Sequence, residues 1–168
     1  MNLIVACDLN WQIGRGGDLL FRIPDDLKRF KSLTTGHPVI LGRKTLATFP
    51  GGRPLPNRPN LILSRNRSYR CDSAIVARSL KQLRKKLEAI GDPDPFVIGG
   101  SEVYRQLLPY CHRAYVTKVY RQFEADSTFP DLDAHPDWTL SEEGPVLAHE
   151  DLEYRFCLYE NQHVEPLP

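Results

Sequence analysis

The sequence predicts a single α/β domain with a mostly parallel central sheet of about eight strands, flanking helices and an antiparallel C-terminal edge. In the first two thirds of the chain, short apolar runs alternate with helical patterns, which is typical of parallel strands joined by helices. In the last third, two segments alternate apolar and polar side chains with a period of two, as antiparallel strands with unequal faces do. A length of 168 residues suits one domain with a sizeable core.

The elements follow from local patterns. Strands are predicted where short apolar runs are bounded by turn residues, at 3–7, 38–41, 60–63, 74–77, 96–98, 114–120 and 152–160. Helices are predicted at 25–34, 43–49, 79–90 and 101–108. Pro24 and Gly36 bound the first helix, and the third has leucines on one face, cations on the other and Gly91 at its end. Three connections are expected to be irregular, namely the glycine-rich 8–22, the proline-rich 50–59 and 132–144.

Composition argues against several classes of function. The formal net charge of +1 gives no general attraction to nucleic acid or membrane, and no apolar run approaches the length of a membrane span. The first seven residues are expected to form a strand and not a leader. The four cysteines lack the spacing of a metal or redox motif, so no metal site is predicted and free thiols in a reducing cytoplasm are expected.

Asp26 is the most informative residue. It lies in the first turn of the first predicted helix, whose apolar stripe is Leu27, Phe30 and Leu33. Helical spacing places Asp26 beside this stripe, where an ionised carboxylate is costly unless a partner pairs with it. Arg29 is expected to point towards the polar side, so a cationic or amidine-like ligand would supply the partner. Alternatively, the acid only complements the positive end of the helix dipole.

Two strand ends carry cations. Residues 42–45 read Gly-Arg-Lys-Thr and open a helix after a buried strand, where two cations oppose the helix dipole unless an anion such as phosphate binds. Ser64 and Arg65 end the next strand, and in nucleotide-binding folds an Arg at such a place suits a 2′-phosphate. These two strand ends favour NADPH over NADH as cofactor, and a solvated cluster of cations is the alternative.

Two further features have an ordinary and a functional interpretation. The adjacent Gly99 and Gly100, with Ser101 as a helix cap, allow the backbone to approach a ligand closely, or they form only a tight turn. Arg58 lies between Pro56 and Pro59, and the stiff backbone there would orient its guanidinium for two-point contact with a carboxylate. From local sequence alone, an exposed loop arginine is a better interpretation of Arg58 than a carboxylate-binding residue.

Six segments resemble the dihydrofolate reductase family in order and spacing, across nearly the whole chain. They are 13–14 (IG), 23–31 (IPDDLKRFK), 39–45 (VILGRKT), 53–58 (RPLPNR), 97–104 (VIGGSEVY) and 126–130 (DSTFP). The resemblance implies a dihydrofolate reductase-like fold in one domain over 1–168, with an adenosine-binding subdomain at about 38–90.

The resemblance also implies an activity. This is the NADPH-dependent reduction of 7,8-dihydrofolate to 5,6,7,8-tetrahydrofolate, with hydride transfer to C6 and protonation of N5. The implied enzyme is a cytoplasmic monomer that binds dihydrofolate and antifolate inhibitors such as trimethoprim and methotrexate, with no obligate nucleic acid and no membrane.

The family's substrate residues carry over onto matching positions. Asp26 would hold the pterin and Thr117 would support its carboxylate by hydrogen bonding. A water entering near Leu19 would protonate N5 while Asp26 stabilises the protonated ring, although a relay through the acid stays open. Arg58 would bind the glutamate α-carboxylate. The other predicted substrate-binding residues are Ile4, Ala6, Leu27, Phe30, Thr48, Phe49, Leu55, Ile98 and Tyr104.

The cofactor residues carry over in the same way. The resemblance implies that they contact the nicotinamide carboxamide, the phosphates and the adenosine, and that Gly99–Gly100 is a cis peptide. The predicted cofactor-binding residues are Ala6, Ile13, Gly14, Gly42, Arg43, Lys44, Thr45, Leu63, Ser64, Arg65, Gly99, Gly100, Ser101, Glu102, Val103 and Tyr104.

The chain departs from the family pattern at several places. Phe21 stands where many members have Trp, and Leu20 stands where Pro is common. Glu102 replaces a basic residue common beside the adenosine 2′-phosphate, for which Arg43, Lys44 and Arg65 are expected to compensate.

Two rival functions remain open on sequence alone. A pyrimidine reductase of riboflavin synthesis would share the fold and NADPH, but it gives less reason for Asp26 together with Arg58. A non-catalytic module would bind the cofactor without binding a pterin.

Overall fold

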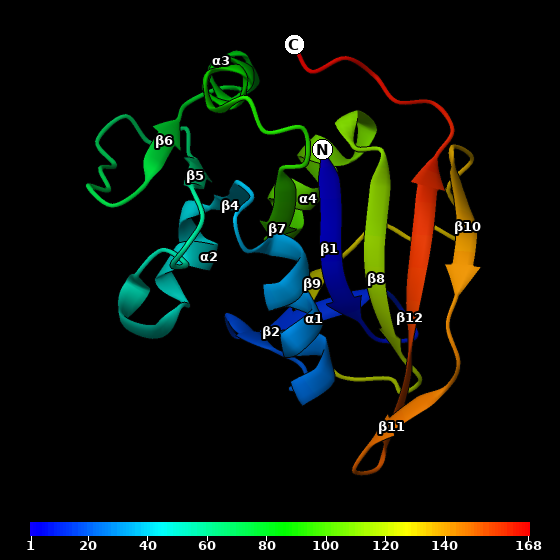
Figure 1. Cartoon of the computed structure of the whole chain (residues 1–168). Coiled ribbons are helices and arrows are strands. Elements are labelled where there is room, and N and C mark those ends of the chain that lie inside the picture. Colours follow the sequence, from blue (N-terminus) through cyan, green and yellow to red (C-terminus); the bar gives the residue numbers. More distant parts are fainter.

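The computed structural model describes all 168 residues and is built on a mixed β-sheet. The strand order is β10-β12-β8-β1-β7-β4-β5-β6, with β11 paired to β12. Figure 1 shows β7, β1, β8 and β12 side by side, with α1 near the lower ends of β7 and β1. The strands of this sheet are β1 (Asn2–Cys7), β4 (Val39–Gly42), β5 (Asn60–Leu63), β6 (Ile75–Ala77), β7 (Phe96–Gly99), β8 (Arg113–Val119), β10 (Trp138–Glu143), β11 (Leu147–His149) and β12 (Leu152–Asn161).

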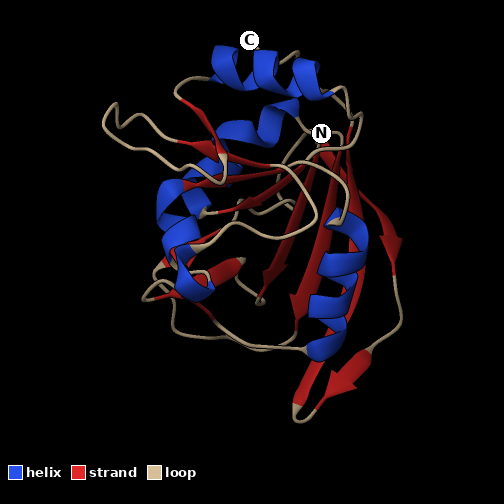
Figure 2. Ribbon diagram, turned by 60° about the vertical axis from the view of Figure 1, so that its left-hand side comes forward, coloured by secondary structure: helices blue, strands red, loops and turns tan.

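Helices lie outside this sheet, which forms the central layer in Figure 2. They are α1 (Pro24–Thr34), α2 (Arg43–Ala47), α3 (Leu80–Ile90) and α4 (Ser101–Leu107), with 3-10 turns η1 (Pro50–Gly52) and η2 (Leu108–Tyr110). No helix has both the length and the apolar surface that crossing a bilayer requires.

The pairing of the strands confirms the predicted sheet. β1 pairs in parallel with β7 and β8, and β4 pairs in parallel with β5 and β7. β8 pairs antiparallel with β12, which also pairs antiparallel with β10 and β11. The parallel strands β1, β4, β5 and β7 therefore end at one edge of the sheet, which is where ligands bind in open α/β folds.

The two faces of β1 are buried by different helices. Leu3 and Val5 join the main core together with residues of α3 and α4, while Ile4 points to the opposite face. On that face, Phe30 and Leu33 of α1 pack against the cluster that contains Ile4. This packing lays α1 across the sheet, and its first turn reaches the carboxyl end of β1.

The segment 8–22 was expected to be an irregular loop, and this expectation is wrong. It contains β2 (Gln12–Arg15) and β3 (Asp18–Leu19), which form a separate three-stranded sheet with β9 (Ser127–Thr128). These strands are only two to four residues long. β2 and β3 form a local hairpin, whereas β9 lies more than a hundred residues from its partner β2, so no local pattern could reveal that second pairing.

The expectation of a loop at 132–144 is also wrong, because β10 occupies 138–143. β10 pairs with one neighbour only, and Trp138 is its one buried residue. A strand with no buried face beyond its first residue does not alternate apolar and polar side chains, so its sequence looked like a loop.

The predicted helices are present with shifted ends. The second helix stops at Ala47, because Thr48 forms its C-cap and the chain then enters the 3-10 turn η1. The helix α4 ends at Leu107 and has Gly100 as its N-cap. The expected cap, Ser101, instead donates its hydroxyl to the carbonyl of Thr128 at 2.6 Å.

Candidate functional site

A cavity of about 1080 Å³ opens at the carboxyl ends of the parallel strands. It extends from α1 and the segment that contains β3, past the start of α4, to the start of α2 and the connection after β5. An apolar middle therefore separates an acidic end at α1 from a basic end at α2 and β5.

Asp26 lies at the acidic end and is held from the sheet. It is the third residue of α1, and the Thr117 hydroxyl of β8 donates to its Oδ1 at 2.5 Å. Burial raises the pKa of Asp26, while the Thr117 hydrogen bond and the positive charge of Arg29 oppose that rise. Ionising this carboxylate is therefore costly, and its oxygens can accept further hydrogen bonds.

Arg29 does not point to the polar side, as the sequence suggested. Its guanidinium lies 4.4 Å from the centre of the Phe156 ring and 5.6 Å from that of Tyr115. These rings belong to β12 and β8, whose packing against α1 was not visible in the helix sequence. Arg29 forms this cation–π contact in place of a salt bridge with Asp26, whose one side-chain hydrogen bond is to Thr117.

The apolar middle of the cavity contains most of the predicted substrate residues. Leu27, which was predicted to contact the substrate, lines the cavity and is 43% exposed. The predicted substrate residues that line the cavity are Ile4, Ala6, Asp26, Leu27, Phe30, Thr48, Phe49, Leu55, Ile98 and Tyr104. Thr117 does not line it and reaches it only through Asp26.

Arg58 lies outside the cavity lining. Its Nη1 donates to the Thr34 hydroxyl at 2.7 Å, and its Nε donates to the Pro56 carbonyl at 2.8 Å. Asn57 has a left-handed φ of 61°, and its carbonyl accepts from the N–H of Gly36, just after α1, at 3.0 Å. These two hydrogen bonds fix the guanidinium at the end of α1 and leave Nη2 without a partner.

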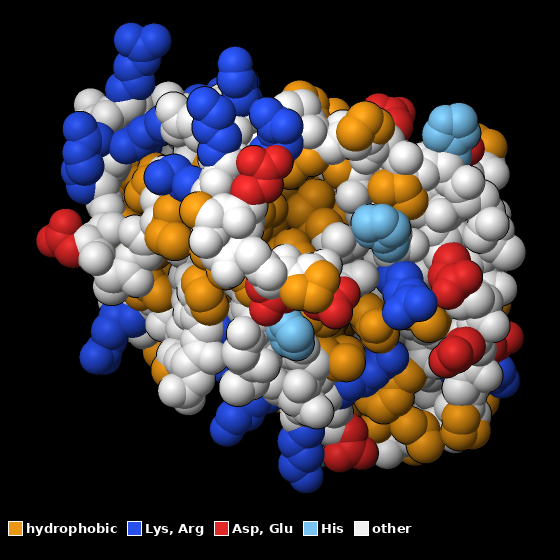
Figure 3. All heavy atoms as spheres, turned by 45° about the horizontal axis from the view of Figure 1, so that its top comes forward, with side chains coloured by type: hydrophobic (Ala, Val, Ile, Leu, Met, Phe, Trp, Pro, Cys, Tyr) orange, Lys and Arg blue, Asp and Glu red, His pale blue; other side chains and the backbone are white.

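The basic end contains all the cofactor residues predicted at the two strand ends. Arg65 pairs with Glu102 of α4 across 3.2 Å, and Arg43 lies over the Tyr69 ring at 5.9 Å. Segment 38–90 holds more than half of the 22 lysines and arginines, and only Asp72 and Glu88 of the 21 acids. Figure 3 shows this charge as a group of Lys and Arg side chains on one side of a hollow lined with apolar atoms.

The Gly99–Gly100 peptide is cis, as the resemblance implied. Gly99 has a φ of 131°, which side-chain-bearing residues rarely adopt, and a Cβ on Gly100 would lie 2.9 Å from the Thr45 hydroxyl. Tyr104, one turn further on, donates its hydroxyl to the carbonyl of Ile4 at 2.7 Å. This join therefore brings β1, α2 and α4 together at the middle of the cavity.

The segment that contains β2 and β3 forms one side of the cavity. Ile13, Gly14 and Leu19, three of the predicted site residues, line it, and Leu19 is 53% exposed. The Gly16 N–H donates to Asp126 Oδ2 at 2.8 Å, which ties this segment to the chain before β9.

Sequence reasoning did not assign several cavity residues. These are Val5, Gly17, Asp18, Leu20, Phe21, Arg22, Ile23, Pro50, Asn66, Arg78, Ser79, Gln106, Asp126 and Ser127. A usable signal existed for Arg78 and Ser79, because they follow β6 just as Ser64 and Arg65 follow β5. The short strand β6 was predicted, but its end was not treated as part of the same edge.

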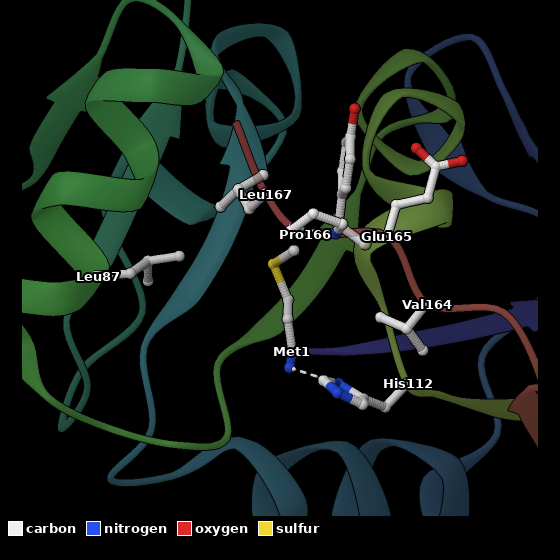
Figure 4. Close-up of a pocket in the computed structure, with 8 residues that line it drawn as sticks. Met1, Leu87, His112, Val164, Glu165, Pro166 and Leu167 are labelled. Atoms are coloured by element: carbon white, nitrogen blue, oxygen red, sulfur yellow. Dashed lines mark hydrogen bonds between the residues drawn. The ribbon is translucent and has the colours of Figure 1, made fainter.

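A second cavity of about 460 Å³ lies between Met1, α3 and the C-terminal segment. Figure 4 shows the Met1 amine beside His112 and the Glu165 carboxylate directed away from Met1. The amine and His112 Nδ1 are 3.3 Å apart, so these polar groups face one another. This cavity lacks the convergent polar groups of the larger one, and the larger one is the candidate functional site.

Fold and cavity together define an α/β protein of the nucleotide-binding kind, with a carboxylate at one end of its cleft and a cluster of cations at the other. The family model for dihydrofolate reductase matches residues 1–162. The dihydrofolate reductase of Bacillus subtilis (strain 168) is 38% identical over 166 residues, which cover 97% of this chain and 95% of that protein. That of Mycobacterium leprae (strain TN) is 44% identical over 120 residues, which cover 71% and 72%.

A solved structure has the same architecture. Dihydrofolate reductase from Enterococcus faecalis complexed with NADP(H) and RAB-propyl superposes with a TM-score of 0.80, at 31% identity over 95% of each chain. The chain belongs to the dihydrofolate reductase family, whose members reduce 7,8-dihydrofolate to tetrahydrofolate with NADPH.

Proposed function

We propose that this chain reduces dihydrofolate at the cavity described above, with the pterin at Asp26 and the NADPH phosphates at the basic end. The Asp26 carboxylate supports this proposal best, because it is partly buried, oriented by Thr117 and unpaired with any cation. The 2-amino group and N3 of a pterin present the two donors that such a carboxylate accepts. Ionisation of Asp26 then becomes favourable once the ring is bound.

The residues divide the remaining tasks. The cofactor supplies a hydride to C6 of the pterin when it is bound. Asp26 stabilises the positive charge that protonation of N5 develops on the ring, while Leu19, half-exposed on β3, borders the path by which a water reaches N5. The apolar side chains of Leu27, Phe30 and Ile98 exclude other water from the reacting faces.

Arg58 is proposed to bind the glutamate α-carboxylate of the substrate. It lies outside the cavity lining, which suits the end of a long ligand that extends out past Leu55. Its two hydrogen bonds, to Thr34 and Pro56, fix the guanidinium before the ligand arrives. Fixing the donor in advance reduces the ordering cost of binding.

The cofactor is proposed to bind along the basic edge. The N–H groups and cations at 42–45 would meet the phosphates, and Ser64 and Arg65 would meet the adenosine 2′-phosphate. We assign 38–90 as an adenosine-binding subdomain of one domain that spans 1–168. We propose that the chain works in the cytoplasm as a monomer. Sedimentation analysis checks the monomeric state directly.

Loss of NADPH absorbance on addition of dihydrofolate tests the proposed function. We expect turnover that trimethoprim or methotrexate blocks, because both present a protonated diaminopyrimidine-type edge to Asp26. A pyrimidine reductase would turn over a phosphorylated ribityl pyrimidine instead, and a non-catalytic module would bind NADPH with no turnover. Either result would exclude dihydrofolate reduction by this chain.

A further inference from the structure

Glu102 and Arg65 form an ion pair inside the basic end of the cavity. Arg65 Nη2 lies 3.2 Å from Glu102 Oε1, and both residues line the cavity. Their side chains are 88% and 76% exposed, and an ion pair this exposed contributes little to stability. Both groups are therefore open to whatever ligand occupies this end of the cavity.

The two side chains suit different cofactors at the same place. An arginine after a strand of a nucleotide-binding sheet suits the 2′-phosphate of NADPH, whereas a carboxylate accepts hydrogen bonds from the free ribose hydroxyls of NADH. A 2′-phosphate must displace Glu102 from Arg65 and then lie close to a carboxylate. NADH leaves the ion pair intact and gives the second oxygen of Glu102 two hydroxyl donors.

The neighbouring cations do not remove this ambiguity. Arg78 is committed to the carbonyls of Asn66 and Tyr69, and Arg43 lies over the Tyr69 ring. The N–H groups and cations at 42–45 would serve the pyrophosphate, which both cofactors carry. Arg65 is therefore the cation best placed for the 2′-phosphate, and it is already paired with Glu102 before a cofactor binds.

We propose that Glu102 makes this chain a dual-cofactor reductase, which uses NADH as well as NADPH. The inference rests on the proposed function for its reaction. NADH transfers the hydride of its nicotinamide C4 to C6 of dihydrofolate and becomes NAD⁺, and one proton from solvent reaches N5. Glu102 acts only in binding, so it changes the affinity for each cofactor and leaves the hydride-transfer step unchanged.

Steady-state kinetics with each cofactor at saturating dihydrofolate provide the first test. Glu102→Gln keeps the shape and removes the charge, so KM for NADPH is expected to fall and KM for NADH to rise, with kcat unchanged. The ratio of the two kcat/KM values is expected to shift towards NADPH by about tenfold to a hundredfold. Arg65→Gln is expected to shift the same ratio in the opposite direction.

A matched control separates this effect from a general change in surface charge. Glu143→Gln removes a glutamate of β10 that lies outside the cavity lining and pairs with Arg155 of β12 at 2.9 Å. We expect this variant to keep the wild-type ratio. An equal shift in Glu143→Gln and Glu102→Gln would overturn the proposal.

Calorimetric titration with NADP⁺ and NAD⁺ makes the test independent of turnover. The ratio of the two Kd values is expected to shift in Glu102→Gln by the same factor as the kinetic ratio. Unchanged Kd values for both nucleotides would overturn the dual-cofactor inference even if the enzyme is active. A shifted Kd ratio in a protein without turnover would support the role of Glu102 and refute dihydrofolate reduction instead.

Discussion

Replacing Asp26 with Asn tests the central assignment of the site. Asn keeps an acceptor for the Thr117 hydroxyl, so the local geometry is retained and only the charge is lost. For a partly buried carboxylate, the attraction to a unit positive charge at about 4 Å is about 4 kcal/mol at an effective dielectric constant of about 20. We therefore expect turnover of dihydrofolate at neutral pH to fall by about a thousandfold.

The loss should depend on pH, because the ring can take its proton from solvent before binding at acid pH. The pH dependence of kcat, measured from mildly acidic to mildly alkaline solution, should show a deficit that shrinks as pH falls. Asp25→Asn is the matched control, since Asp25 lies in the same first turn with 64% of its side chain exposed and only Lys28 as ion-pair partner. A wild-type rate for Asp26→Asn at neutral pH would remove this residue from the mechanism.

Three further experiments have defined outcomes. Burial raises the pKa of Asp26, so the folded protein is favoured while Asp26 is protonated, below the unfolded pKa, and this advantage is lost as pH rises through the folded pKa. Urea denaturation of the ligand-free protein should therefore show Asp26→Asn more stable than wild type at neutral pH and equally stable at acid pH. Thr117→Val removes the hydrogen bond that opposes this rise, so the acid limb of the pH–rate profile should move to higher pH and neutral activity should fall by about tenfold or more. Arg58→Leu should raise KM for dihydrofolate by about tenfold to a hundredfold with kcat nearly unchanged, and an unaltered KM would refute the carboxylate assignment.

The parallel part of the fold could be predicted because each strand and helix is specified locally. The apolar run at 38–41 is buried on both faces, and the leucines of α3 recur at helical spacing, so both elements are visible in a short window. The pairing of β2 with β9 could not be predicted, since it joins short segments more than a hundred residues apart, and the local β2–β3 hairpin has strands too short to show an apolar pattern. β10 escaped prediction because an exposed edge strand carries no hydrophobic alternation.

Some features of the candidate site could also be predicted from the sequence, and others could not. The cations at 42–45 and at Arg65 could be placed together from sequence, because parallel strands end at a common edge. The orientation of Arg29 could not, because its aromatic partners come from β8 and β12, more than eighty residues later. The Arg65–Glu102 ion pair was not predicted, although the resemblance placed both residues beside the adenosine 2′-phosphate, because it joins the connection after β5 to the first turn of α4.

The electrostatics at Asp26 depend on strand register as much as on the acid itself. β8 lies against β1 with Thr117 opposite Ala6, and this register puts Thr117 on the face covered by α1. Successive side chains of a strand point to opposite faces, so a shift of one residue would present Val116 or Lys118 to Asp26. Val116 would leave the carboxylate without a donor, and Lys118 would supply the cation that the bound ring is proposed to provide. Because Ala114 and Val116 are fully buried in the main core, such a shift would also expose apolar side chains. Packing of the core on one face of β8 therefore sets the register that places Thr117 against Asp26 on the other face.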